Sequence, residues 1–145
     1  MLTHSTEIAR SPEDVFSYLS QLERHGEWQT QIVQVKDISD GPVAVGTRAT
    51  DRRKMPGGER DMTYEITAYD PPRSVSFHGT NGPIRVAGTV TVEPLDDSAR
   101  SKVTLQFNLE GHGIGKLIAP LANWDAKRQI PKDQQRLKER LEAGA

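Results

Sequence analysis

Asp51, Arg53 and Tyr64 are the residues whose types and spacing suggest chemistry at a buried site. A turn at Gly57-Gly58 would fold residues 46–69 into a hairpin, with Asp51 opposite Tyr64 and Arg53 on the same face. That face is otherwise apolar, and burial there would raise the pKa of a carboxyl group toward neutrality. An aspartate beside a phenol could orient a ligand hydroxyl or act as a general base, and Arg53 could hold a carboxylate or carbonyl oxygen. These three residues are the catalytic candidates.

The two charged residues also have a structural interpretation. If this end of the hairpin runs past the core, Asp51 and Arg53 reach water or pair with each other. Solvated or paired charges are the common case in folded proteins, because an unpaired buried charge is costly. The sequence leaves both interpretations open.

Large apolar side chains are expected to surround the same space. The aromatic residues among them are Trp28, Phe77, Phe107 and Trp124. Ordinary core packing is the alternative for these residues, because aromatic side chains bury large areas wherever they fit. Gly88 on the inner face indicates empty space, or else a bulge or bend in the sheet. The complete set of expected ligand-binding residues is Trp28, Asp51, Arg53, Tyr64, Phe77, Val86, Phe107, Leu117, Leu121 and Trp124.

Other common catalytic patterns are missing from the sequence. No histidine has a partner at metal-ligand spacing, and no serine, histidine and aspartate set can be assigned, so neither a metal site nor a triad is expected. The glycine cluster Gly111–Lys116 lies between a strand and a helix but has neither spacing typical of a phosphate-binding loop. The expectation is therefore that the protein uses no cofactor.

The elements that must position these residues are four successive hairpins between residues 46 and 110, whose apolar residues fall on one common face. Their turns are expected at Gly57-Gly58, Asp70–Arg73, Asn81-Gly82 and Asp96–Ala99. These turns pair Ala68 with Val75, Phe77 with Val86, and Val92 with Val103. The pattern predicts a curved antiparallel sheet with one apolar face.

Helices are expected on both sides of these hairpins. A first strand, Leu2–Ala9, precedes a helix that Ser11 can cap and that has Pro12 at its first position. A short helical turn carrying Trp28 and a strand over residues 31–39 follow. The last segment, about residues 115–143, reads as a long amphipathic helix, and Pro131 predicts a kink or break near residue 129.

Composition limits the kinds of protein to consider. The chain has 145 residues, a net charge of -1 and no cysteine, which predicts one domain and excludes disulfides and thiolate catalysis. A near-neutral charge gives no general attraction to nucleic acid or an anionic membrane. No apolar run is long enough for a signal peptide or a membrane span, so a cytoplasmic monomer or homodimer without stable membrane insertion is expected.

The order of elements and several short motifs resemble the polyketide cyclase/dehydrase-like branch of the START or SRPBCC superfamily, which shares the helix-grip fold of the birch-pollen allergen. The matching stretches cover essentially the whole chain: Ser11–Phe16, Tyr18-Leu19, Glu27-Trp28, Ser39–Pro42, Val45–Arg48, Tyr64–Arg73, Gly88–Pro94 and Leu137-Lys138. They are mostly turns, caps and core positions, so the resemblance speaks for the fold more than for an activity.

The resemblance implies an α+β helix-grip fold, in which a seven-stranded antiparallel sheet wraps around a long C-terminal helix and leaves a hydrophobic cavity between them. It carries over no shared catalytic residues. The leading expectation is a carrier or sensor for a small hydrophobic molecule of polyketide, lipid or aromatic type. An aromatase, cyclase or dehydratase acting on such a molecule is the alternative, and a partner-protein-binding module is a weaker one.

Overall fold

The structure is a computed structural model that describes residues 1–145. Its elements, in chain order, are β1 (Leu2–Ile8), α1 (Pro12–Leu19), the 3₁₀ helix η1 (Leu22–Glu27), β2 (Ile32–Lys36), β3 (Arg48–Met55), β4 (Gly58–Asp70), β5 (Ser74–Gly79), β6 (Ile84–Leu95), β7 (Arg100–Gly111) and α2 (Gly115–Glu142). All strands belong to one antiparallel sheet in the order β1-β7-β6-β5-β4-β3-β2.

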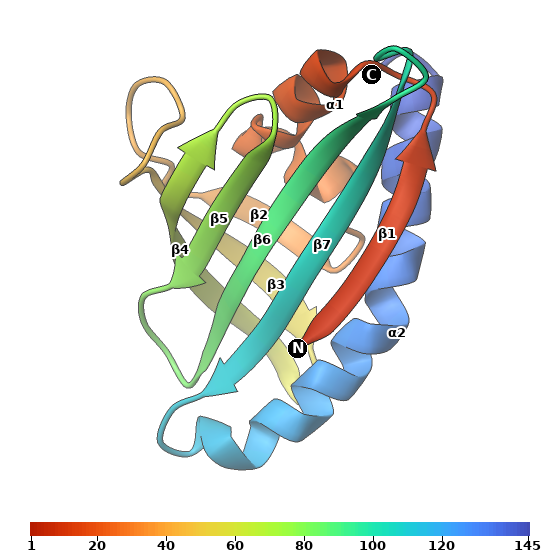
Figure 1. Ribbon diagram of the computed structural model, residues 1–145. Helices are drawn as coiled ribbons and strands as arrows, with labels where there is room; N and C mark the ends of the chain where they lie inside the picture. The colour runs from red at the N-terminus through yellow and green to blue at the C-terminus, as the bar shows by residue number, and fades with distance from the viewer.

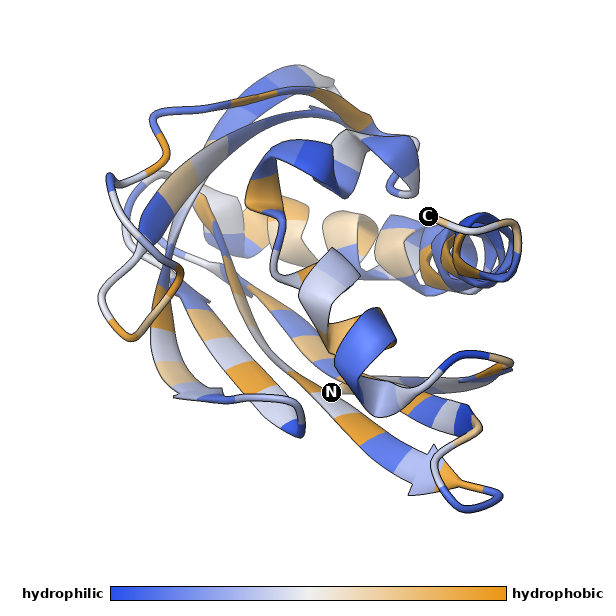
Figure 2. Ribbon diagram, turned by 90° about the horizontal axis from the view of Figure 1, so that it is seen from above, coloured by the Kyte–Doolittle hydropathy of each residue, from blue (hydrophilic) through white to orange (hydrophobic).

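The sheet curves around the helices, and α2 runs across its open side (Figures 1 and 2). This arrangement confirms the predicted α+β helix-grip fold with seven antiparallel strands and a long C-terminal helix. None of the helices combines the length and the apolar character needed to cross a membrane.

The pairing of β3 with β4 differs from the prediction by two residues. Asp51 lies opposite Met62 rather than Tyr64. The hairpin turns at Pro56-Gly57 instead of Gly57-Gly58, so the two-residue turn lies one position earlier in the chain. Because side chains alternate with a period of two, this shift by itself moves no residue to the other face. Asp51 and Tyr64 therefore still share the inner face of the sheet.

The remaining hairpins confirm the prediction only in part. Val92 lies opposite Val103 as expected, whereas Phe77 lies opposite Gly88 instead of Val86. The loop around Asn81-Gly82 is wider than a two-residue turn, because β5 ends at Gly79 and β6 begins only at Ile84. This change again moves the register by an even number of residues and preserves the inner face.

A bulge in β4 corrects one inner-face prediction. The register shifts between Ile66 and Ala68, so that Tyr69, not Ala68, lies opposite Val75. The extra residue turns Ala68 outward, where it is exposed, and brings Tyr69 against the core. The bulge thus supplies the inner face with an aromatic ring.

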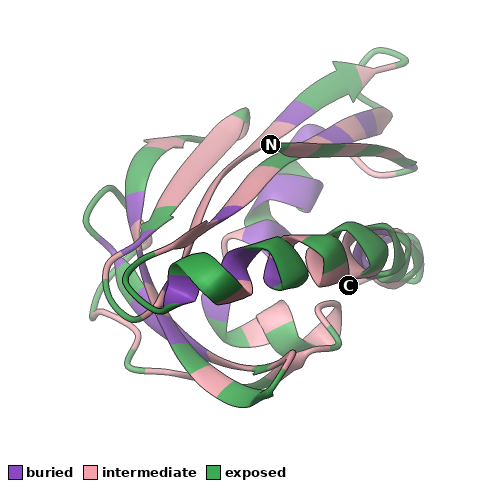
Figure 3. Ribbon diagram, turned by 90° about the horizontal axis from the view of Figure 1, so that it is seen from below, coloured by how far each residue is buried: buried purple, intermediate pink, exposed green.

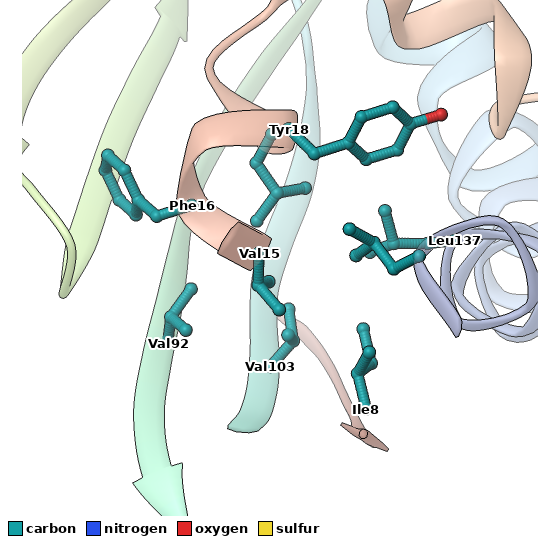
Figure 4. Close-up of a cluster of buried hydrophobic side chains, with 9 residues drawn as sticks. Ile8, Val15, Phe16, Tyr18, Val92, Val103 and Leu137 are labelled. Carbon is teal, nitrogen blue, oxygen red and sulfur yellow. The ribbon is translucent and has the colours of Figure 1, made fainter. Parts of the chain in front are cut away.

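The main core lies at the end of the molecule where α1 closes the curved sheet. Ser11 caps α1 through its side-chain oxygen, which accepts a hydrogen bond from the Asp14 amide, and Pro12 occupies the first helical position, as predicted. Val15 of α1 then packs into a cluster with residues of the sheet and of α2 (Figure 4), comprising Ile8, Val15, Phe16, Tyr18, Leu19, Val92, Val103, Leu137 and Leu141.

Of the predicted kink or break near residue 129, the break is wrong, because α2 is continuous from Gly115 to Glu142. Pro120 and Pro131 both lie inside its 28 residues. A proline removes one backbone hydrogen bond and crowds the preceding turn, and a helix can absorb this by bending. Figure 1 shows α2 changing direction along its length as it follows the sheet.

Candidate functional site

A cavity of about 180 Å³ lies between the inner face of the sheet, η1 and α2. Of its 31 lining residues, 21 are hydrophobic, so it suits a mainly apolar occupant. An apolar cavity of about 150 Å³ can hold benzene, and the volume found here therefore corresponds to a molecule of one or two rings.

The sheet supplies most of the apolar wall. Phe77 packs edge-on against Tyr64, with ring centroids 6.1 Å apart. The ring of Phe77 lies over Gly88, where a Cβ atom would be only 2.9 Å from Cζ of Phe77. Gly88 therefore makes room for an aromatic ring on the wall and leaves no empty space of its own, which the sequence did not distinguish.

Seven of the ten predicted ligand-binding residues line the cavity, namely Trp28, Asp51, Arg53, Tyr64, Phe77, Val86 and Phe107. The other three do not. Leu117, Leu121 and Trp124 lie on the outer face of α2, with 83%, 51% and 55% of their surface exposed. Figure 3 shows this exposed face along the helix, with buried residues on its inner side. Their expected place around the cavity is wrong.

The reason is the rotational phase of α2. Its C-terminal half is fixed by Leu137 and Leu141, which are fully buried. Counting back from them by three or four residues brings Ile130, Ala126 and Ala122 onto the inner side, and all three line the cavity. The largest apolar residues of the N-terminal half are out of this phase, so small alanines face the cavity in their place.

Asp51 and Arg53 form the charged part of the cavity wall. The Asp51 side chain is 9% exposed, and its Oδ2 atom lies 3.7 Å from Nη1 of Arg53. The same Nη1 atom donates a 2.7 Å hydrogen bond to Oε1 of Gln29. Burial raises the pKa of Asp51, and the positive charge of Arg53 offsets part of this increase. The two charged side chains thus point into the cavity, as the functional interpretation expected. They also lie near each other, as the structural interpretation expected.

Three buried polar atoms of the cavity wall have no hydrogen-bond partner in the protein: Oδ1 of Asp51, the hydroxyl oxygen of Tyr64 and Nε1 of Trp28. Only two other buried side-chain atoms of the chain share this condition, in Thr80 and Arg140, and neither residue lines the cavity. Burial, followed by the negative charge of Asp51, raises the pKa of Tyr64, so the phenol keeps its proton. Unpaired polar groups are therefore concentrated at this site.

His25 adds a further acceptor to the same wall. Its Nε2 atom lies 2.7 Å from the Leu19 carbonyl oxygen, and its ring packs edge-on against Trp28 at a centroid distance of 5.5 Å. Burial lowers the pKa of His25. A neutral ring that donates from Nε2 carries a bare lone pair on Nδ1. His25 is then an uncharged acceptor beside Asp51 and Trp28.

Hydrogen bonds between the η1–β2 segment and α2 close one side of the cavity. Oδ1 of Asp133 accepts from the Thr30 amide at 3.3 Å and from Nε2 of Gln129 at 3.2 Å, and Nε2 of Gln31 donates to Asp125 at 2.9 Å. Burial raises the pKa of Asp133, and the hydrogen bonds that it accepts from Gln129 and Thr30 oppose the increase. The contacts hold the segment carrying Trp28 and Gln29 against the helix.

His25, Gln29 and Asp133 also line the cavity, although the expected ligand-binding set did not include them. For Asp133 a signal existed, because it belongs to the helical face of Ile130 and Leu137 once the phase of α2 is taken from its C-terminal half. For His25 and Gln29 no periodic signal exists, since η1 is short and the chain after it is irregular. Their position depends on tertiary contacts, such as the hydrogen bond between Gln29 and Arg53 of β3.

Known proteins resemble this chain in both sequence and fold. The sequence profile of the family described as polyketide cyclase/dehydrase and lipid transport matches residues 1–142. The chain belongs to this family. An uncharacterised protein of Mycobacterium tuberculosis strain H37Rv is 25% identical over 124 residues, which are 85% of this chain and 83% of that protein.

Solved structures similar to this family member share its fold at low sequence identity. The Zhui aromatase/cyclase of Streptomyces sp. R1128 superposes with a TM-score of 0.77 at 14% identity, covering 96% of this chain and 91% of that one. A START superfamily protein from Mycobacterium smegmatis gives a TM-score of 0.75 at 14% identity, covering 97% of each chain. These similarities show a shared fold only. An activity cannot be inferred from sequence identities this low.

Proposed function

We propose that the protein binds a small, largely apolar molecule in the cavity between the sheet and α2, as a carrier or a sensor. The cavity itself carries this proposal: it is about 180 Å³, and its wall is mostly apolar and has a few converging polar groups. The family description, which includes lipid transport, is consistent with such a role.

Native mass spectrometry of the gently purified protein tests this function. A bound molecule should add its mass to that of the chain and appear in an organic extract of the sample. Ala126→Phe should abolish this added mass, because it places a ring in the cavity. Leu117→Phe, on the exposed face of the same helix, is the matched control and should keep the bound molecule.

The mass of the protein without a ligand would also be observed if the ligand had dissociated during purification. Naphthalene should therefore be added to the protein and its uptake measured. A chain that gives a bare mass and takes up no naphthalene contradicts the proposal and favours a role in binding a partner protein.

A second candidate is an enzyme that moves a proton on the bound molecule, of the aromatase, cyclase or dehydratase type. The observation that favours it is the convergence of Asp51 and His25, two proton acceptors, in one largely apolar site. Deuterium exchange at a carbon of a bound ketone such as 2-tetralone distinguishes the two functions. An enzyme should accelerate the exchange and lose the effect in Asp51→Asn, whereas a carrier should not accelerate it.

A further inference from the structure

The unpaired atoms of the cavity wall specify which polar group a ligand needs, an inference that rests on the proposed function. Trp28 offers only a donor, Asp51 when ionised offers only acceptors, and Tyr64 offers one donor and can also accept. The register places Asp51 and Tyr64 on the same face of neighbouring strands, one residue pair apart on that face. His25 packs on Trp28 and adds an acceptor. One ligand group must therefore meet donors and acceptors together.

We propose that the cavity selects a neutral ring molecule of one or two rings bearing a hydroxyl group, held by Asp51, Tyr64 and Trp28. The hydroxyl donates its proton to Oδ1 of Asp51 and accepts from Nε1 of Trp28 or from the Tyr64 phenol. A hydroxyl is the smallest group that can both donate and accept a hydrogen bond. It therefore places no donor of the site against a donor and no acceptor against an acceptor.

Charged ligands fit this end of the cavity less well. A carboxylate has only acceptors and would meet the Asp51 carboxyl group, whose own acceptor atom would stay unpaired. Arg53 would attract it, but Asp51 lies 3.7 Å from this guanidinium and Gln29 already occupies one of its donors. An ammonium group would satisfy Asp51, yet it would lie near Arg53 and leave the Trp28 and Tyr64 donors unpaired.

An ether is the informative neutral comparison. It can accept from Trp28 or Tyr64, but it has no proton for Asp51, so Oδ1 remains buried without a partner. A site built to hydrogen-bond a hydroxyl discriminates strongly against analogues that lack it, because the buried groups of the site are then left unpaired. The preference for the alcohol over its methyl ether therefore measures the proposed contact.

Isothermal titration calorimetry of the full chain at pH 7 with 2-naphthol, 2-methoxynaphthalene, naphthalene and 2-naphthoate tests the proposal. We expect 2-naphthol to bind at least about tenfold more tightly than the methyl ether and the carboxylate, the effect of one satisfied hydrogen bond at a buried acceptor. Tyr64→Phe and Asp51→Ala should each reduce this preference severalfold while naphthalene binding persists.

Two substitutions serve as matched controls. Tyr18→Phe removes a buried phenol that does not line the cavity and whose hydroxyl already donates to Glu27, so the preference for 2-naphthol should remain. Asp61→Ala removes an exposed carboxylate of β4 and should also leave the preference unchanged. If Asp51→Ala does not fold, Tyr64→Phe, which conserves volume, is sufficient for the test.

The outcomes separate this inference from the proposed function. Equal affinity for 2-naphthol and its methyl ether would overturn the hydroxyl inference and leave the binding function intact. Tightest binding of 2-naphthoate would also overturn it, because Arg53 would then determine selectivity. Binding of none of the four compounds would contradict the binding function and this inference together.

Discussion

Asp51 carries a carboxyl group that is almost completely buried on the inner face of the sheet. One of its oxygens has no partner, and its nearest cation, Arg53, lies beyond hydrogen-bond distance at 3.7 Å. His25 and Tyr64 are the other titratable groups that act on it, from η1 and β4. The folded protein consequently binds a proton at Asp51 more tightly than the unfolded chain does.

This difference predicts the direction of a pH effect on stability. Because folding raises the pKa of Asp51, its contribution to stability is fully present below pH 3.8 and is lost as the pH rises through the folded pKa. An asparagine side chain at this position does not titrate and would have no such dependence. Asp51→Asn should therefore melt at a higher temperature than the wild type at pH 7, and the difference should shrink toward pH 4.

Thermal melts across this pH range measure the effect. Asp61→Asn is the matched control, because Lys36 and Arg52 lower the pKa of that carboxyl group and the dependence should reverse in sign. A melting temperature of Asp51→Asn below that of the wild type at pH 7 would show that the buried carboxylate is stabilising, contrary to this account.

At the residue scale, the sequence predicted the inward polar candidates but not their partners. Alternation along the strand was enough to place Asp51, Arg53 and Tyr64 on the inner face. Gln29, which binds Arg53, comes from an irregular segment whose path depends on tertiary packing. Side-chain pairing across such a segment has no periodic signature in sequence.

At the scale of elements, the face of each strand was easier to predict than its register. Moving a turn from Gly57-Gly58 to Pro56-Gly57 changes every cross-strand pair and leaves the inner face unchanged, because the register moves by two. The bulge before Ala68 has no such tolerance, since a single extra residue exchanges the faces of the residues that follow. Nothing local to residues 66–69 distinguishes a bulge from a regular strand.

Gly88 provides a test of how tightly the strands of the cavity wall are packed. In Gly88→Ala the new Cβ would lie 2.9 Å from the Gln106 carbonyl oxygen and 2.9 Å from Cζ of Phe77. We expect the free energy of unfolding in urea to fall by roughly 1–3 kcal/mol, as for other overpacked cores. The displaced Phe77 ring should also weaken naphthalene binding.

Ala87→Val is the control for this change, because its side chain projects from the opposite face of β6. Its effect on the unfolding free energy should stay within about 0.5 kcal/mol. A neutral or stabilising Gly88→Ala substitution would mean that Phe77 moves freely, and the cavity wall would then be less rigid than described.

At the scale of the whole molecule, α2 has two unlike faces. Its inner face combines core residues with the small residues of the cavity wall, and its outer face leaves Leu117, Leu121 and Trp124 uncovered. From the sequence, the residues of the outer face were expected around the cavity. The choice between the two faces required the position of the helix against the curved sheet, which is set by contacts with the preceding strand β7 and with β1, far away in the chain.

A pair of leucine substitutions tests this orientation. Leu137→Ala should lower the free energy of unfolding by about 2–5 kcal/mol, because the side chain is 1% exposed and belongs to the main core. Leu117→Ala should change it by no more than about 0.5 kcal/mol, since 83% of that residue is exposed. Urea denaturation measures both. A comparable loss in the two variants would show that the outer face of α2 is covered in solution.

The chain contains two tryptophans, and the fold places them in opposite surroundings. Trp28 lines the cavity with its indole N–H unpaired, whereas Trp124 is 55% exposed on the outer face of α2, with the Arg128 guanidinium 4.8 Å from its ring centroid. Indole emission follows the polarity and hydrogen bonding around the ring. A ligand entering the cavity would therefore alter the fluorescence emission of Trp28 and leave the emission of Trp124 constant. The protein thus contains both an optical reporter of occupancy and its internal reference.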